Sequence, residues 1–380
     1  MVELAAKRSL IDELGIDRKI LEPKKQQTTK KIEYVRAYVE DWLFVMCANP
    51  DIKTITFIDA MCNCGIYQDG DLGTAGEVCR LFVKFGKWHP NIKFYLYLND
   101  KKIERVDCCT EVCCSLIYPS CRNVNIVHAN LDVNDFLLEA ATTAKVPSGF
   151  GNAVLLFVDP YNARTVHLDS LVAFIRSRYC EVLFTWFSSD PRRNQESEAI
   201  ADCLDGLTIP PGADAGEMVA DKLRTGKMKY VFRYAFRTVT NVELYQIIFV
   251  TPSARGLEKL KEALWSTFHG AAYHKNMPPQ LAGQPTLFSE KDFEKSNAEG
   301  YAGDAKIRLF EEFGGMGGVS YQSIQAFVLE QTMLREGQIL DLLIKPLVKS
   351  GLIKKDGKVS RRNYKGDTYT FVELEKEPNS

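Results

Sequence analysis

Short apolar runs alternate with helical patterns between residues 54 and 186, and this alternation constrains the fold more than any other sequence feature. The runs are rich in β-branched and aromatic residues and are bounded by turn residues, which is typical of buried strands. They lie at 55–58, 94–98, 124–127, 153–158 and 181–186. Amphipathic patterns at 76–85, 103–117 and 168–175 lie between them. Strands that alternate with helices predict an α/β fold with a doubly wound, mostly parallel sheet.

Polar side chains follow the first three predicted strands: Asp59, Asp100, and Asn130 with the nearby Asp132. Ligands of open α/β sheets bind at the carboxyl ends of strands, so we expect these side chains to hold a cofactor, with Asp100 on a ribose. The loop 59–65, DAMCNCG, lacks a full GxGxxG fingerprint, which favours a mononucleoside over a dinucleotide. Gly65 would let the backbone approach the ligand closely. The alternative is that a strand-end Asp only caps a turn or helix.

The fourth strand ends in Asp159-Pro160-Tyr161-Asn162. A carboxylate and a backbone carbonyl can accept hydrogen bonds from the N–H groups of an amine while an aromatic ring stacks on it. These residues are therefore the predicted catalytic group, with a planar amine as the acceptor. The alternative is an ordinary turn after a strand.

The rest of the chain divides into further predicted parts. An amphipathic helix spans 32–46, and two strands at 230–237 and 243–250 form an antiparallel hairpin. A helix follows at 256–267. We expect an N-terminal helical extension at 1–50, an α/β domain at 51–270 with a helical insertion at about 188–227, a linker at 271–314, and a winged-helix-like domain at 315–380.

The C-terminal part has the order helix, helix, basic turn, strand. Its basic side chains suit nucleic-acid phosphates, although winged helices also contact proteins and charge runs are often solvated. The predicted nucleic-acid-binding residues are Lys345, Lys354, Lys355, Arg361 and Arg362 here, with Arg192 and Arg193 from the α/β domain. Pro346 removes one backbone hydrogen bond and should kink its helix, which argues against groove recognition.

Composition excludes several classes of protein. The 380 residues carry a net charge of −1, so nucleic-acid binding would need a local patch. No apolar run approaches a membrane span, and residues 1–15 lack the apolar core of a signal peptide, so we expect a cytoplasmic protein without membrane contact. All 11 cysteines lie between Cys47 and Cys203, mostly in strand and helix patterns. We expect them to be reduced and structural, with no metal site.

The strand series, the acid after the second strand and the DPPY-like sequence after the fourth resemble class I S-adenosylmethionine-dependent methyltransferases. These enzymes also carry an antiparallel strand insertion at the end of the sheet, which the 230–250 hairpin resembles. More narrowly, the chain resembles the three-Cys-motif partner protein (TcmP) family, over most of its length. The resembling segments are TTKKIEYVRAYVEDW, FIDAMCNCGIYQDGDLGTAG, LLFVDPYN, EVLFTWFSSDPRRN, FVTPSARGLEKLKEALW and VSYQSIQAFVLEQTMLREGQILDLLIKPLVKSGLI.

This resemblance implies a methyltransferase-like Rossmann core, S-adenosylmethionine as cofactor, a winged-helix-like end and a partner protein with a cysteine motif. The family loop resembles D-x-F-A-G-P-G, whereas here Cys62, Asn63 and Cys64 replace the small residues and the proline. Two functions stay open. One is methyl transfer to an amine, such as one on a nucleic-acid base. The other is a catalytically silent module that binds nucleic acid or the partner protein. A nuclease ranks last, because the strand-end acids are dispersed.

Overall fold

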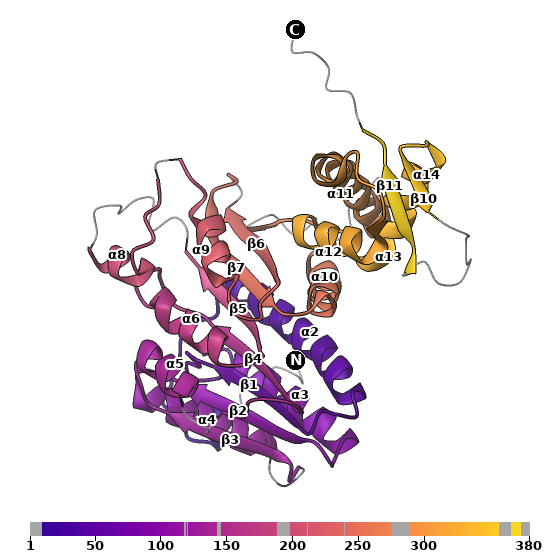
Figure 1. Ribbon diagram of the computed structural model, residues 1–380. Coiled ribbons are helices and arrows are strands. Elements are labelled where there is room, and N and C mark those ends of the chain that lie inside the picture. Colours follow the sequence, from indigo (N-terminus) through magenta and orange to yellow (C-terminus); the bar gives the residue numbers. More distant parts are fainter. Residues whose placement is uncertain are drawn as a thin grey trace. The chain divides into compact units, whose positions relative to one another are not determined.

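The computed structural model describes residues 10–117, 119, 121–142, 146–187, 198–210, 212–238, 240–275, 289–356 and 366–373. The chain forms two compact units (Figure 1). The first unit comprises Met1–Gly256 and Ala272–Pro278, and the second comprises Leu257–Ala271 and Pro279–Ser380. Among the described residues, none of the helices combines the length and apolarity that crossing a membrane requires.

The first unit is built on a mostly parallel sheet whose described strands run in the order β3-β2-β1-β4-β5-β7-β6-β8. Their bounds are β1 Thr54–Asp59, β2 Lys93–Asn99, β3 Val124–Ala129, β4 Asn152–Val158, β5 Glu181–Trp186, β6 Tyr230–Thr238, β7 Glu243–Thr251 and β8 Tyr273–Lys275. Strand β7 pairs antiparallel with both β5 and β6, while the other pairings are parallel. The predicted doubly wound sheet and its antiparallel insertion are thus confirmed.

Helices cover both faces of this sheet (Figure 1). They are α2 Gln26–Ala48, α3 Thr74–Trp88, α4 Ile103–Ile117, α5 Val133–Thr142, α6 Leu168–Ser177, α8 Glu198–Leu204 and α9 Ala215–Leu223. Apolar residues of α5, α6 and α9 share one buried cluster with the strands. Elsewhere, Phe82 of α3 packs on Phe94 of β2 with ring centres 5.2 Å apart. Because both faces are covered, β4 is buried along nearly its whole length, as its unbroken apolar run predicts.

The direction of winding reverses between β1 and β4. From β1 the chain moves outward to β2 and then β3, and it returns through α5 to β4 on the other side of β1. The connections that follow β1 and β4 therefore run in opposite directions from the sheet. Such a reversal leaves a crevice at the carboxyl ends of these two strands. Open α/β sheets bind ligands at such a reversal.

The second unit combines helices with a small antiparallel sheet in the order β10-β11-β9. Its elements are α10 Ala254–Phe268, which belongs to this unit from Leu257 onward, α11 Glu290–Phe313, β9 Val319–Ser320, α12 Tyr321–Gln331, α13 Glu336–Gln338, the π-helical η1 Ile339–Ile344, α14 Lys345–Lys349, β10 Ile353–Asp356 and β11 Thr368–Phe371. The expected order of two helical stretches and two strands is present. Its interpretation as a winged helix stays a prediction.

Helix α11 forms within the segment 271–314, which the sequence analysis expected to be a linker. Its glycines and alanines suggested a linker, yet Ala298, Ala302, Ala305 and Leu309 recur at helical spacing and are all buried. Ser289 also begins the helix with a capping box to Asp292. A stripe of small residues thus forms the packed face of a helix.

The helix type changes next to Pro346, while the kink expected there stays a prediction. Pro346 has no N–H to donate, and the residues before it form the π-helical turn η1 rather than an α-helix. The N–H of Lys345 donates to the carbonyl of Leu340, five residues earlier. The extra residue in this turn accommodates the missing hydrogen bond.

Candidate functional site

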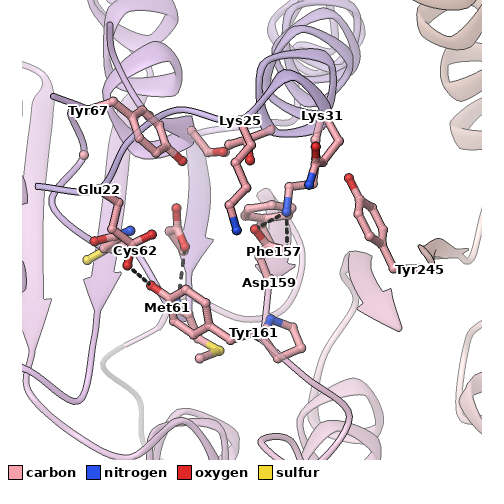
Figure 2. A pocket seen from close by; sticks show the side chains of 18 of the residues that line it. Glu22, Lys25, Lys31, Met61, Cys62, Tyr67, Phe157, Asp159, Tyr161 and Tyr245 are labelled. Carbon is pink, nitrogen blue, oxygen red and sulfur yellow. Dashed lines mark hydrogen bonds and ion pairs between the residues drawn. The ribbon is translucent and has the colours of Figure 1, made fainter. Parts of the chain in front are cut away.

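A cavity of about 300 Å³ lies in the first unit at the carboxyl ends of β1 and β4. Three parts of the chain form most of its lining: the segment before and at the start of α2, the loop after β1, and the end of β4. Tyr245 of β7 adds an aromatic side chain. Figure 2 shows the acidic, basic and aromatic side chains that surround it. The cavity occupies the reversal point of the sheet, where the sequence predicted a ligand.

Asp159, the first residue of the predicted catalytic group, holds an amine of the protein itself. The Nζ atom of Lys31 on α2 donates to both carboxylate oxygens of Asp159, at 2.6 and 2.5 Å. The same nitrogen lies 5.3 Å from the ring centre of Tyr245. Lys31 is only 9% exposed. The carboxylate after β4 thus faces the cavity and binds an ammonium group, as Figure 2 shows.

Asp59, at the end of β1, also lines the cavity but is almost fully buried. Burial, helped by the nearby charges of Asp159 and Asp100 and opposed by a hydrogen bond from the Met61 N–H, raises the pKa of this carboxyl to about 8. Asp59 therefore keeps its proton at neutral pH. It contributes a neutral hydrogen-bonding group to the cavity rather than a second negative charge.

The other predicted strand-end residues do not line the cavity but hold the loops around it. The carboxylate of Asp100 accepts from the N–H groups of Asn63 and Lys102, at 3.1 and 3.0 Å. The side-chain amide of Asn130 donates to the carbonyls of residues 100 and 101. Asp132 accepts from the Asn134 N–H at the start of α5. These polar groups join the ends of β1, β2 and β3 through the backbone.

Gly65 lines the cavity through its backbone, but its lack of a side chain serves packing. Its φ angle of +69° lies in the left-handed region, and a Cβ there would approach Cys109 Sγ to 2.7 Å. The Gly65 carbonyl accepts from the Gly73 N–H at 2.8 Å. The loop after β1 therefore packs against α4, and a hydrogen bond within the loop joins Gly65 to Gly73.

Buried thiols form the contact between this loop and the helices beside it. The thiols of Cys62 and Cys109 are neighbours, as are those of Cys64 and Cys108. All 11 cysteines are free, and no set of described residues gathers the His, Cys, Asp or Glu side chains that a metal ion needs. The substituted loop thus fills with thiols the space between β1 and α4.

The remaining predicted catalytic residues divide between the cavity and the turn beyond it. Pro160 and Tyr161 line the cavity, whereas the Asn162 side chain accepts from the Arg164 N–H at 2.9 Å within the turn. The Tyr161 hydroxyl accepts from Arg105 at 2.6 Å, and Arg105 also pairs with Glu22 at 2.8 Å. Tyr161 is therefore held by α4 and by the segment before α2.

Residues 20–31 form a wall of the cavity that the sequence did not predict. This N-terminal segment is bonded to the loop after β1: the Gln68 side chain donates to the carbonyl of Leu21 at 2.8 Å, and Lys24 pairs with Asp71 at 2.6 Å. Lys31 could have been found, because it precedes Val35 by four residues and so lies on the buried stripe of α2. A lysine on such a stripe needs an anionic partner.

Two buried polar atoms of the cavity lining have no hydrogen-bond partner within the described part of the chain: the Tyr245 hydroxyl and the Gln27 Oε1 atom. Tyr245 is only 6% exposed. A buried polar group without a partner costs about 1–3 kcal/mol, so each is a place where a ligand would be favoured. No pattern in the sequence distinguishes these two residues.

The predicted nucleic-acid-binding residues are mostly untested by the structure. Arg192, Arg193, Arg361 and Arg362 lie outside the described residues. In the second unit, Lys345 pairs with Asp341 at 2.5 Å and Lys355 pairs with Asp367. Lys354 is exposed on β10. Nucleic-acid binding therefore stays a prediction.

No family model and no curated protein matches the chain. Solved structures similar to it include the methyltransferase domain of bacterial CtHen1, at 10% identity and a TM-score of 0.32, covering 57% of this chain and 99% of that one. Another is the 16S rRNA (adenine(1408)-N(1))-methyltransferase from Catenulisporales acidiphilia, at 12% identity and a TM-score of 0.30, covering 56% and 91%. Loganic acid methyltransferase matches at 9% identity and a TM-score of 0.28, covering 73% and 91%.

The chain thus has a distant structural similarity to class I S-adenosylmethionine-dependent methyltransferases. A similarity of this size carries no functional assignment, which has to come from the site. Membership of the three-Cys-motif partner family stays a prediction.

Proposed function

We propose that the cavity of the first unit binds S-adenosylmethionine and transfers its methyl group to an amine. The observation that carries this proposal is the Asp159 carboxylate, which faces the cavity at the reversal point of the sheet and accepts hydrogen bonds from an amine nitrogen through both oxygens. An exocyclic amine of a nucleic-acid base is one acceptor of this chemistry.

The donor set of the cavity suits the amino-acid end of the cofactor. Lys25 extends into the cavity and offers a cation for a carboxylate (Figure 2). The unpartnered Gln27 Oε1 and the carboxylate of Glu22 offer acceptors for an ammonium group. When bound, the cofactor supplies an electrophilic methyl group on a sulfonium. Asp100 does not line the cavity and accepts from the backbone N–H groups of Asn63 and Lys102, so the expected ribose contact has no support from its position.

The protein's own contribution is to position the acceptor. Asp159 accepts from the N–H groups of the amine and so turns its lone pair toward the methyl group. Pro160 and Tyr161 bound the same end of the cavity, and Arg105 and Glu22 fix the Tyr161 ring. Positioning of this kind can supply several kcal/mol of the barrier without acid–base catalysis.

The first test is titration of the purified chain with S-adenosylhomocysteine by calorimetry, beside a methyl-transfer assay on extract fractions from a strain lacking the gene. We expect saturable binding in wild type. Asp159→Asn should bind the cofactor product equally but transfer methyl groups roughly a hundredfold more slowly, since Asn can donate and turn the wrong group inward. Asn162→Ala, in the adjacent turn, is the matched control.

No binding at millimolar concentration would contradict the proposal and favour a catalytically silent module. Equal turnover in Asp159→Asn and wild type would show that Asp159 has no role in methyl transfer.

A further inference from the structure

Lys31 places a primary amine of the protein at the position proposed for the acceptor. Its Nζ atom donates to both oxygens of Asp159, and Asp159 is the residue proposed to hold the substrate amine. We propose that Lys31 is a self-methylation site, at which the chain transfers a methyl group from S-adenosylmethionine to its own ε-amine. This inference rests on the proposed function.

The surroundings of Lys31 suit an amine before and after methylation. The Lys31 side chain is 11% exposed and the Asp159 side chain 23%, so the pair is largely shielded from water. The Tyr245 ring centre lies 5.3 Å from Nζ and offers its face to a cation. A singly or doubly methylated ammonium keeps an N–H for Asp159 and its charge for the ring. The pocket thus accommodates the product as well as the substrate.

The reaction balances with the groups present and the cofactor as the only co-reactant. The Lys31 ammonium first passes one proton to the Asp159 carboxylate beside it, which leaves a lone pair on nitrogen. That lone pair forms the N–C bond to the methyl group while the C–S bond breaks, and its electron pair stays on sulfur as a neutral thioether. Nitrogen is then a methylated ammonium, and the proton leaves Asp159 for solvent. Asp59 is an unsuitable proton acceptor, because burial keeps it protonated at neutral pH.

Two other lysines on the same part of the chain provide matched controls. Lys25 lines the same cavity but is exposed. Lys30, next to Lys31, pairs with Glu33 at 2.6 Å and does not line the cavity. If the Asp159 contact selects the target, the methyl group should go to Lys31 and to neither of these.

The experiment incubates the purified full chain with S-adenosylmethionine carrying a trideuterated methyl group, which separates new methylation from any acquired during expression. Intact-mass measurement followed by peptide mapping reads the product. We expect the label on Lys31, with a rate per chain that is independent of protein concentration because the amine lies inside its own cavity. Lys31→Arg, which keeps a cation beside Asp159, should lose the label, while Lys30→Arg, outside the cavity lining, should keep it.

S-adenosylhomocysteine titration of each variant separates the possible failures. Normal binding without label, or with label on Lys25 or another residue, would overturn this inference and leave the proposed function standing. Absence of both binding and label in wild type would overturn the proposed function and this inference together. A rate proportional to protein concentration would also overturn it, because transfer would then occur between chains.

Discussion

The residues that follow β4 and β2 are similar in sequence but have different roles in the structure. An aspartate directly follows the last residue of each strand. Asp159 after β4 faces the cavity and binds the Lys31 amine. Asp100 after β2 turns toward the backbone and accepts from the N–H groups of Asn63 and Lys102. A carboxylate at a strand end can therefore hold either a ligand or the loop that borders a ligand.

The difference depends on whether backbone N–H groups lie within hydrogen-bonding distance of the carboxylate. The loop after β1 brings the Asn63 N–H toward β2, and Asp100 satisfies it. At β4 the corresponding side chain meets a lysine instead. Mutations that separate these two roles test the comparison directly.

The largest expected effect comes from breaking the Asp159–Lys31 pair. Removing one partner of a buried ion pair leaves an uncompensated charge and costs about 3–5 kcal/mol. Because both side chains keep some exposure, we expect the lower end of this range for Asp159→Ala and for Lys31→Met, measured by urea unfolding. The double variant should lose clearly less than the sum of the single variants. Additive losses would show that the two groups do not interact.

Asp59 tests whether a strand-end acid of the cavity acts in its neutral form. Its folded pKa of about 8 lies above its ordinary value of 3.8, so its contribution to stability is complete below pH 3.8 and is lost as the pH rises toward 8. Asp59→Asn keeps an acceptor for the Met61 N–H but cannot ionise. Denaturant unfolding from pH 4 to 8 should show wild type losing stability relative to this variant. Parallel curves for the two proteins would mean that Asp59 is ionised in the folded state.

Asp100 tests the loop-holding role. Asp100→Ala leaves two backbone N–H groups without their acceptor and should cost about 1–3 kcal/mol of folding stability. Its affinity for S-adenosylhomocysteine should fall with that stability, because the loop after β1 loosens. Asp100→Asn keeps an acceptor for only one of these two N–H groups, which donate to different oxygens of Asp100, so it should recover only part of the stability and the affinity. A loss of affinity in both variants at unchanged stability would instead support the ribose contact expected from the sequence.

Asp132 should give the smallest effect. It caps the first turn of α5 through the Asn134 N–H, and replacing such a cap by alanine costs typically about 1 kcal/mol. Thermal unfolding of Asp132→Ala should show this loss, with unchanged S-adenosylhomocysteine affinity. A weakened affinity for S-adenosylhomocysteine at unchanged stability would indicate that Asp132 contacts the ligand.

The strands and the polar residues that follow them could be predicted from the sequence, because buried parallel strands appear as continuous apolar runs. The sequence could not show which way each polar side chain turns, since that depends on N–H groups supplied by other loops. Lys31 was missed because the partner of that lysine is 128 residues away in the sequence. Helix α11 was missed for a different reason, since alanines at helical spacing can form a packed face without large apolar residues.

The N-terminal segment that forms one wall of the cavity has a consequence for the kinetics with which the proposed ligand would bind. Residues 20–31 are tied to the loop after β1 by Gln68 and Asp71, and to α4 by Arg105. If the proposed ligand is enclosed by this wall, its release would require some of these bonds to break. Its residence time is then governed by how often the wall detaches, and its on-rate falls below the diffusion limit for the same reason. A site can thus hold a ligand for long periods even where the equilibrium affinity is modest.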